Sequence, residues 1–187
     1  FRSNESGAYA LTRLLTPMIK FRACRDARKV TGDAMEVRGG CGYIEEWGDP
    51  RIVRDAHLGS IWEGTSNIVA LDVMRAIVRE DALPVWHQHM ETLMAATPWH
   101  PQVRACLQTL LAQVHTLAEQ TAHTKQESMA RQAASALYHL TTAMAMGWEA
   151  GKTGSMRRML LAQLLLRHRL LPHNPVQPPQ AVDLAPL

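Results

Sequence analysis

Apolar residues repeat at helical spacing along most of the chain, and no long stretch shows the alternation of a half-buried strand. A first stripe follows Thr16-Pro17, which resembles an N-cap with proline at the first helical position, and it ends at Gly39-Gly40. Its small residues predict close approach to a neighbouring helix; they are Ala23, Ala27, Val30, Ala34 and Val37.

Further helices follow with short connections. A second long helix begins after Gly64, with Ile68, Leu71, Met74 and Val78 on its buried edge. Four more are expected: a shorter one over about 85–96, two long ones marked by the stripes in 103–117 and 133–148, and a last one over 156–171. Gly151 and Gly154 are expected to end the fourth long helix. The pattern predicts an all-α fold, an antiparallel helical bundle.

The expected organisation has three parts. Residues 1–81 form a helical core, residues 82–171 form an additional helical region packed on it, and residues 172–187 form an extended, proline-rich tail. The chain does not begin with Met and helical periodicity starts within a few residues, so we expect it to be a piece of a longer protein.

Composition supports the helical prediction. Hydrophobic residues make up 47% of the chain and aromatic residues only 5%, which favours packed helices over a β-sandwich. Cys24, Cys41 and Cys106 lack the spacing of a disulfide framework or a zinc site, so we expect a reducing cytoplasm and no metal. No apolar run is long enough to span a membrane, and we expect a soluble protein.

The net charge of +3 is too small to indicate a nucleic-acid binder by itself, but the positive surplus lies in the second half. Its basic residues permit a solvated face, a contact with acidic residues of another subunit, or a phosphate-binding patch; they include Lys152, Arg157, Arg158, Arg167 and Arg169.

Gly39-Gly40-Cys41-Gly42 has two interpretations. The segment follows a helix rather than a strand, which excludes the dinucleotide fingerprint. It is either a plain helix C-cap or a glycine turn whose backbone N–H groups approach a phosphate.

The segment from Ile61 to Asn67 carries the sharpest chemical signal. Ile61 and Trp62 are expected to withhold the Glu63 carboxylate from water and raise its pKa, as suits a base near neutral pH. The alternative is a glutamate in the first turn of a helix, favoured there by the helix dipole alone.

Three other polar groups are interpreted structurally. Arg54-Asp55 is expected to be an ion pair that ties the connecting segment to a helix, and His57 is a lone structural histidine. His87 and His89 lack a third metal ligand at a suitable spacing.

Three linked motifs resemble the C-terminal helical domain of flavin-dependent acyl-CoA dehydrogenases. They are Ala34–Tyr43, Arg54-Asp55-Ala56 and Ile61–Ile68, in this order, and the resemblance covers Thr12 to about Glu80. Glu36 and Trp62 stand where many members have Gln and Tyr, as in the bacterial AidB-like, adaptive-response branch. Members of that branch also carry an additional C-terminal helical region.

The resemblance implies roles for matching residues. Glu63 is the base that removes the α-proton of an acyl-CoA thioester, with its backbone N–H polarising the thioester carbonyl, and Trp62 and Gly64 contact this substrate. Residues expected to bind FAD are Glu36, Gly39 and Gly40, which approach the flavin of a neighbouring subunit, and Thr65, Ser66 and Asn67.

The resemblance also implies an oxidoreductase parent that forms a homotetramer. The family's N-terminal and middle domains are not in this sequence, so we expect the chain alone to bind no FAD and to be inactive. Two alternatives remain: an AidB-like flavoprotein that binds and protects DNA through its basic C-terminal helices, and a purely oligomerising helical bundle.

Overall fold

The chain folds into helices joined by short connections. The structure is a computed structural model, and it describes residues 2–171 and residue 176. In order, the elements are α1 (Arg2–Val37), α2 (Gly40–Tyr43), α3 (Asp49–Leu58), α4 (Ser66–Glu80), α5 (Ala82–Ala95), α6 (Pro101–His123), a short 3-10 helix η1 (Glu127–Met129), α7 (Ala130–Thr153) and α8 (Met156–Arg169). The described residues contain no strand, which confirms the predicted all-α class.

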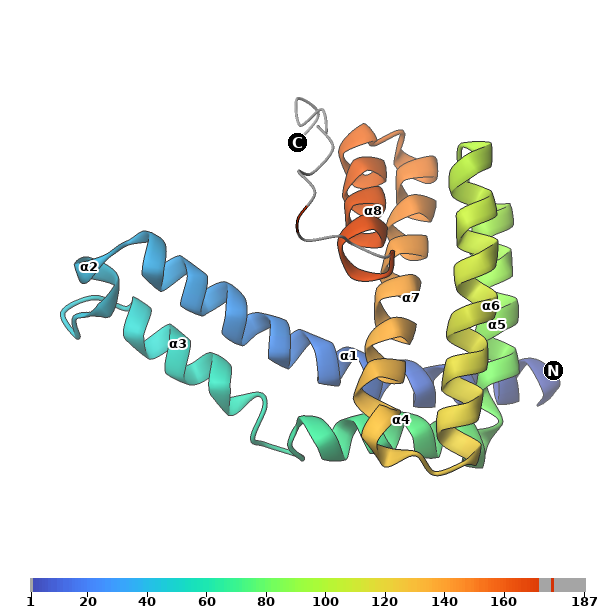
Figure 1. Cartoon of the computed structure of the whole chain (residues 1–187), viewed down its shortest axis with the longest axis horizontal. Coiled ribbons are helices and arrows are strands. Elements are labelled where there is room, and N and C mark those ends of the chain that lie inside the picture. Colours follow the sequence, from blue (N-terminus) through green and yellow to red (C-terminus); the bar gives the residue numbers. More distant parts are fainter. Residues whose placement is uncertain (1, 172–175, 177–187) are drawn as a thin grey trace.

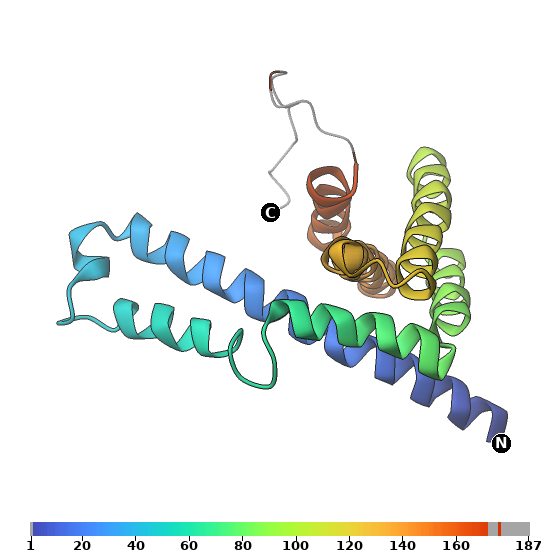
Figure 2. The same cartoon turned by 60° about the horizontal axis from the view of Figure 1, so that its bottom comes forward.

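Two regions differ in shape (Figure 1). The first half of α1 lies beside α4 under a set of helices formed by α5 to α8, and we call residues 6–21 and 66–171 the body. The second half of α1 continues away from the body and is joined by α2 to the returning α3; we call residues 22–65 the arm. Figure 2 shows that α1 and α4 run side by side before the arm separates from the body.

One hydrophobic core runs through the body. It contains residues of α1, α4, α5, α6, α7 and α8, and its largest fully buried side chains include Leu14, Trp86, Leu107 and Leu137. The indole of Trp86 also donates a hydrogen bond from Nε1 to Thr141 Oγ1 at 2.8 Å. Residues on both sides of the expected 81/82 boundary therefore share this core, and the three-part division itself stays a prediction.

The arm buries far less. All residues between Phe21 and Val69 are described, and none of their large hydrophobic side chains belongs to the core. The exposed ones are Val30, Val37, Tyr43, Ile44, Trp47, Ile52, Leu58, Ile61, Trp62 and Ile68. Two paired helices without a third layer cannot cover both faces, so apolar area stays in contact with water.

The expected helix start at Thr16-Pro17 is wrong. α1 already begins at Arg2, and Pro17 lies inside it. The Thr16 hydroxyl caps nothing and donates to the Thr12 carbonyl at 2.8 Å. Interior proline costs about 3 kcal/mol. The burial of Leu14, Met18 and Phe21 on the core side of the same helix offsets this cost.

The expected end of α7 is confirmed at Gly154 but not at Gly151. The helix continues through Gly151 to Thr153 and ends at Gly154, whose φ of 70° is left-handed. Gly151 provides space for packing: a Cβ there would lie 2.7 Å from Pro98 Cδ, and a Cβ on Gly147 would lie 2.0 Å from the Trp99 ring. Because neither glycine has a side chain, the α5–α6 connection can pack closely against α7.

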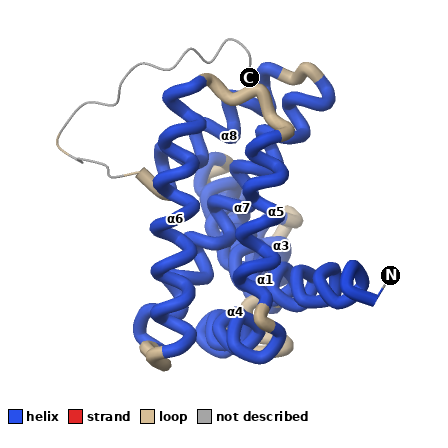
Figure 3. Tube along the Cα trace, turned by 90° about the vertical axis from the view of Figure 1, so that its right-hand side faces the viewer, coloured by secondary structure: helices blue, strands red, loops and turns tan. Residues whose placement is uncertain are grey.

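α8 packs along α7 (Figure 3). Its Ala162 and Leu166 are buried there, which gives its apolar sequence a partner within the chain. The expected extended tail lies outside the described residues, apart from Val176.

Candidate active site

Glu63 lies in the turn that leads from the arm back to the body. Its φ is 57° and that of Gly64 is 106°, so two consecutive residues adopt left-handed backbone conformations. For a residue with a side chain, this conformation costs on the order of 1–3 kcal/mol, and such strain is concentrated at functional sites. The turn must therefore be held by contacts outside itself.

Residues of α1 hold this turn. Lys20 Nζ donates to the carbonyl oxygens of Gly59, at 3.1 Å, and Trp62, at 2.5 Å. Ser60 Oγ donates to the Cys24 carbonyl at 3.2 Å. The roles of Lys20 and Ser60 could not be predicted from the sequence, because a single lysine and a single serine form no recognisable pattern. Lys20 fixes the backbone on the N-terminal side of Glu63.

A charged cleft of about 410 Å³ opens beside Glu63, between α1 and α4. Its lining residues are Arg13, Thr16, Pro17, Lys20, Glu63, Ile68, Val69, Asp72 and Arg75. Two carboxylates, those of Glu63 and Asp72, thus lie among three cationic side chains. Asp72 is 3.8 Å from Arg75, whereas no ion pair of Glu63 is found among the described residues.

The expected shielding of Glu63 is wrong for this chain. Glu63 is exposed, and Ile61 and Trp62 are themselves 64% and 68% exposed. The alternative of a glutamate in the first helical turn is wrong as well, because α4 begins only at Ser66. Both interpretations assumed that Glu63 and its apolar neighbours join a compact helix start, but they precede it in an open turn.

The beginning of α4 offers unused backbone donors. Thr65 is the N-cap residue and its side chain makes no capping hydrogen bond. The first N–H groups of an α-helix have no partner within the helix, and together with the helix dipole they favour an anion. Ser66 is half-buried while Thr65 and Asn67 are exposed, so the first turn of α4 is open to a phosphate group.

The glycine turn lies at the opposite end of the arm. Gly39 has a φ of 59°, and a Cβ on the buried Gly42 would lie 2.3 Å from the Met35 carbonyl oxygen. The fold of the arm therefore requires both glycines. Gly40 is different, because it is helical and a Cβ there would meet nothing within 4 Å. Glu36 is exposed one turn earlier, at the end of α1.

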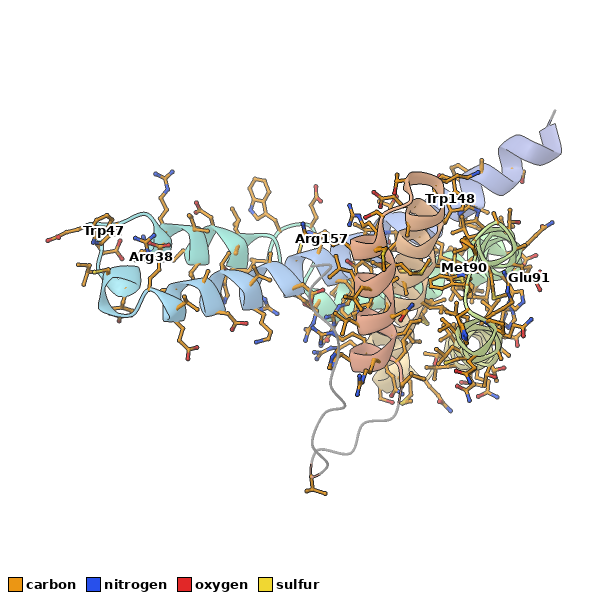
Figure 4. All side chains as sticks on the ribbon, turned by 90° about the horizontal axis from the view of Figure 1, so that it is seen from above. Arg38, Trp47, Met90, Glu91, Trp148 and Arg157 are labelled. Carbon is orange, nitrogen blue, oxygen red and sulfur yellow. The ribbon has the colours of Figure 1, made fainter. Side chains whose placement is uncertain are left out.

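The expected site residues thus form two separate groups. Trp62, Glu63, Gly64 and the start of α4 lie at the base of the arm, beside Lys20. Glu36, Gly39 and Gly40 lie near its tip, where Figure 4 labels Arg38 and Trp47. With a rise of about 1.5 Å per residue, Lys20 and Glu36 are about 24 Å apart along α1. One chain alone does not bring the two groups together.

Exposed ion pairs lie at the tip of the arm. Arg54 and Asp55 do not pair with each other: Arg54 binds both carboxylate oxygens of Glu45, at 2.6 and 3.1 Å, and Asp55 lies 3.7 Å from Arg51. The hydrogen bond from Arg54 lowers the pKa of Glu45. Arg54 therefore ties α3 to the connecting segment, as expected, but through a different partner.

The described residues contain neither a candidate metal site nor a membrane-spanning helix. No group of three histidine, cysteine, aspartate or glutamate side chains in this part of the chain is arranged to hold a metal ion. Of the helices that the structure describes, none combines the length and the apolarity needed to cross a membrane.

Comparison with known proteins finds relatives of the first segment. Residues 3–78 match the family model described as "Acyl-CoA dehydrogenase, C-terminal domain". "Acyl-CoA dehydrogenase family member 11" of Caenorhabditis elegans is 38% identical over 88 residues, which are 46% of this chain and 14% of that protein. "Putative acyl-CoA dehydrogenase AidB" of Escherichia coli (strain K12) is 46% identical over 68 residues, which are 36% of this chain and 13% of AidB. This segment is therefore similar to acyl-CoA dehydrogenase C-terminal domains.

The fold similarity extends further along the chain. The crystal structure of Caenorhabditis elegans ACDH-11 in complex with C11-CoA superimposes on 90% of this chain with a TM-score of 0.80 and 23% identity. The fold of α5 to α8 thus has a counterpart in that protein. The superposition covers only 31% of ACDH-11, so this chain spans less than a third of that protein.

Proposed function

We propose that the chain supplies the C-terminal helical part of an FAD-dependent acyl-CoA dehydrogenase and that Glu63 is the catalytic base. The observation that carries the proposal is the strained turn held by Lys20: Glu63 has a left-handed backbone, is fixed through Lys20, and lines a cleft without a salt-bridge partner among the described residues. The acyl-CoA dehydrogenase relationship of residues 3–78 supplies the reaction class.

The described residues fit a flavin. The open first turn of α4 would hold a phosphate of the cofactor through backbone N–H groups near Thr65, Ser66 and Asn67. At the tip, Gly40 lacks a side chain although its own fold does not require this, which favours close approach by another molecule. When bound, the flavin supplies the hydride acceptor for oxidation of the acyl chain.

The chain's own residues would bind substrate and move a proton. A Glu63 carboxylate oxygen would take the α-proton of the acyl-CoA thioester, and the Glu63 backbone N–H would stabilise charge on the thioester carbonyl oxygen. Lys20 would keep this backbone in place, while Trp62 and Gly64 would contact the substrate. Removal of the α-proton together with the β-hydrogen leaves an α,β-unsaturated acyl-CoA.

The separation of the two groups supports a shared site. Because Glu36 lies about 24 Å along α1 from Lys20, and Gly39 and Gly40 follow beyond the end of that helix, these residues would serve the flavin of a neighbouring subunit. The exposed apolar residues of the arm, including Trp47 and Ile52, are suited to cover such a neighbour. This arrangement requires a homo-oligomer, for which we propose a tetramer.

Exposure of Glu63 implies that other domains complete the pocket. The aligned segments cover only 13–14% of the relatives above, so the flavin-binding and CoA-binding walls would come from additional protein. We therefore expect the isolated chain to bind no FAD, and a flavin absorbance spectrum of the purified chain is the check.

The decisive test compares the two carboxylates of the cleft. In the longer protein that this proposal requires, Glu63→Gln is expected to slow flavin reduction by acyl-CoA by roughly 10²–10⁴-fold. Asp72→Asn is the matched control, because Asp72 lines the same cleft but is near Arg75. It should retain the rate within about threefold, since truncation of an exposed charge pair has a small effect. Equal rates for wild type and Glu63→Gln would refute the base assignment.

DNA binding through the C-terminal helices is the second candidate, but the charges of α8 do not form one face. Arg157 and Arg158 lie at its start and Arg167 and Arg169 in its last turn, about 15 Å away along the helix. Arg158 is also 3.2 Å from Glu149. Duplex binding at low salt that weakens steeply with added salt would support this role.

A further inference from the structure

A second polar site lies where α1 passes the middle of α7 and the end of α8. A pocket of about 320 Å³ between α6, α7 and the end of α8 has Gln113, Gln132, Ser135, His139 and Arg169 as its polar lining. Arg22 reaches it from α1, with Nη1 3.5 Å from Ser135 Oγ. Arg22 follows Lys20 by two positions, about 200° around the helix, so this site is on the opposite side of α1 from the Glu63 cleft.

The charges at this site do not balance. Arg22 and Arg169 both act on His139, and Arg22 also acts on Arg25, which is near Arg28 and Arg131. Asp26, which pairs with Arg22, is the one carboxylate that acts on His139 and Arg25 among the described residues. Two guanidinium groups thus act on His139 against a single negative charge.

Two polar atoms at the site are buried without a partner. Within the described part of the chain, Nε of Arg22 and Nδ1 of His139 have no hydrogen-bond partner. The side chain of Arg22 is 12% exposed and His139 only 6%. A buried polar atom without a partner is costly, and more so when it is charged. Two such atoms beside one pocket favour a ligand that forms hydrogen bonds with them.

The electrostatics agree with the missing negative charge. Burial, followed by repulsion from Arg22 and Arg169, lowers the pKa of His139 to about 4. His139 is therefore neutral at pH 7, and its imidazole can donate a hydrogen bond from one ring nitrogen. Burial and then repulsion from Arg131, Arg22 and Arg28 also lower the pKa of Arg25. An anion in the pocket would offset the positive charges of Arg22 and Arg169 beside His139.

We infer that this pocket binds a compact phosphate-type anion, held by Arg22 and Arg169 and by hydrogen bonds from Ser135 and His139. A phosphate suits the site better than a carboxylate, because it carries up to two charges and offers more acceptor oxygens to several guanidinium forks. A small anion suits it better than a nucleic-acid duplex, because Arg22 and His139 are recessed between three helices. The inference does not depend on the role of Glu63.

Calorimetric titration tests the inferred anion binding. The purified chain is titrated with inorganic pyrophosphate and with inorganic phosphate at constant ionic strength. We expect saturable binding, with pyrophosphate the tighter of the two. Arg22→Gln and Arg169→Gln should each weaken binding by roughly tenfold or more, since each removes a charged hydrogen bond. Arg157→Gln, at the other end of α8, is the matched control and should leave binding unchanged.

Several results would overturn the inference. The inference is wrong if the wild-type chain shows no saturable binding to either anion. It is also wrong if Arg157→Gln lowers the affinity as much as Arg22→Gln and Arg169→Gln do. Arg169 is exposed, so Arg169→Gln keeps the test valid even if Arg22→Gln does not fold. A short DNA duplex that binds through these arginines and is not displaced by pyrophosphate would show a polynucleotide surface instead.

Discussion

The body buries most of its large apolar side chains, whereas the arm exposes most of its own. The contrast occurs within a single helix: α1 places Leu14, Met18 and Phe21 in the core, yet Val30 and Val37 on the same helix are 64% and 89% exposed. Helical stability in proteins comes mainly from packing of an apolar face. We therefore expect the body to be the more stable part, and the arm, which carries most of the proposed flavin and substrate residues, to gain stability from a partner surface.

The largest expected effect is on packing in the body. Gly147→Ala would place a methyl group 2.0 Å from the Trp99 ring, so we expect the free energy of unfolding to fall by about 3 kcal/mol. Gly32→Ala in the arm half of α1 is the matched change, since a Cβ there meets nothing within 4 Å. It should raise stability by up to about 1 kcal/mol. Urea unfolding followed by circular dichroism measures the free energy of unfolding of both variants. Similar changes in the two variants would contradict the difference in packing between body and arm.

A smaller effect concerns pH at the junction of body and arm. Burial, with repulsion from Arg22 and Arg169 against attraction from Asp26, lowers the pKa of His139 from 6.5 to about 4. The unfolded chain then binds more protons between these values. His139 should therefore contribute full stability above pH 6.5 and progressively lose it as the pH falls to 4, by on the order of 2 kcal/mol.

Unfolding free energies measured across this pH range check the prediction. His139→Gln should show a flatter dependence than wild type, whereas His57→Gln on the arm should not. An identical pH dependence for wild type and His139→Gln would contradict it.

A still smaller effect is expected from strain at Glu63. Glycine adopts left-handed backbone without strain, so Glu63→Gly should be about 1 kcal/mol more stable than Glu63→Ala, which keeps a Cβ at a φ of 57°. Thermal unfolding of the two variants measures the difference. If alanine is as stable as glycine here, Glu63 is not held under strain.

The smallest expected effect lies at the exposed tip of the arm. The hydrogen bond from Arg54 lowers the pKa of Glu45, so Arg54→Gln should return that pKa toward its ordinary value. A carboxylate titration followed by NMR measures this shift. The thermal midpoint should barely change, because exposed ion pairs contribute little to stability.

The helix class and most body helices could be predicted from the sequence, because an apolar stripe on a helix indicates a buried face. The buried edge expected for α4 is wrong in part: Ile68 and Val78 are each 50% exposed, and Val69, Val73 and Ile77 are buried with Met74 instead. The start of α1 could not, since the burial of Leu14 and Met18 outweighs the local effect of Pro17. Gly151 resembles a helix end in sequence, but in the structure it and Gly147 are points of close contact with the α5–α6 connection. Whether a glycine ends a helix or, like Gly147, packs against a distant side chain such as Trp99 depends on residues far along the chain.

The site was predictable only as a set of motifs. The glycine turn and the Glu63 segment were recognised as an ordered pair, but their separation at two ends of the arm is a property of the helical hairpin. The apolar residues beside Glu63 suggested burial, and the structure places them outward because no third layer covers the arm. The anion pocket joins residues from α1, α7 and α8, which no local pattern connects.

Amide hydrogen exchange along α1, measured at a concentration where the chain is monomeric, tests the contrast between body and arm most directly. We expect the amides of residues 14–21 to be protected roughly a hundredfold more than those of residues 30–37, although both belong to one helix. Protection in residues 30–37 should rise when a partner covers the arm. Uniform protection along α1 in the monomer would contradict the claim that the arm depends on a partner surface.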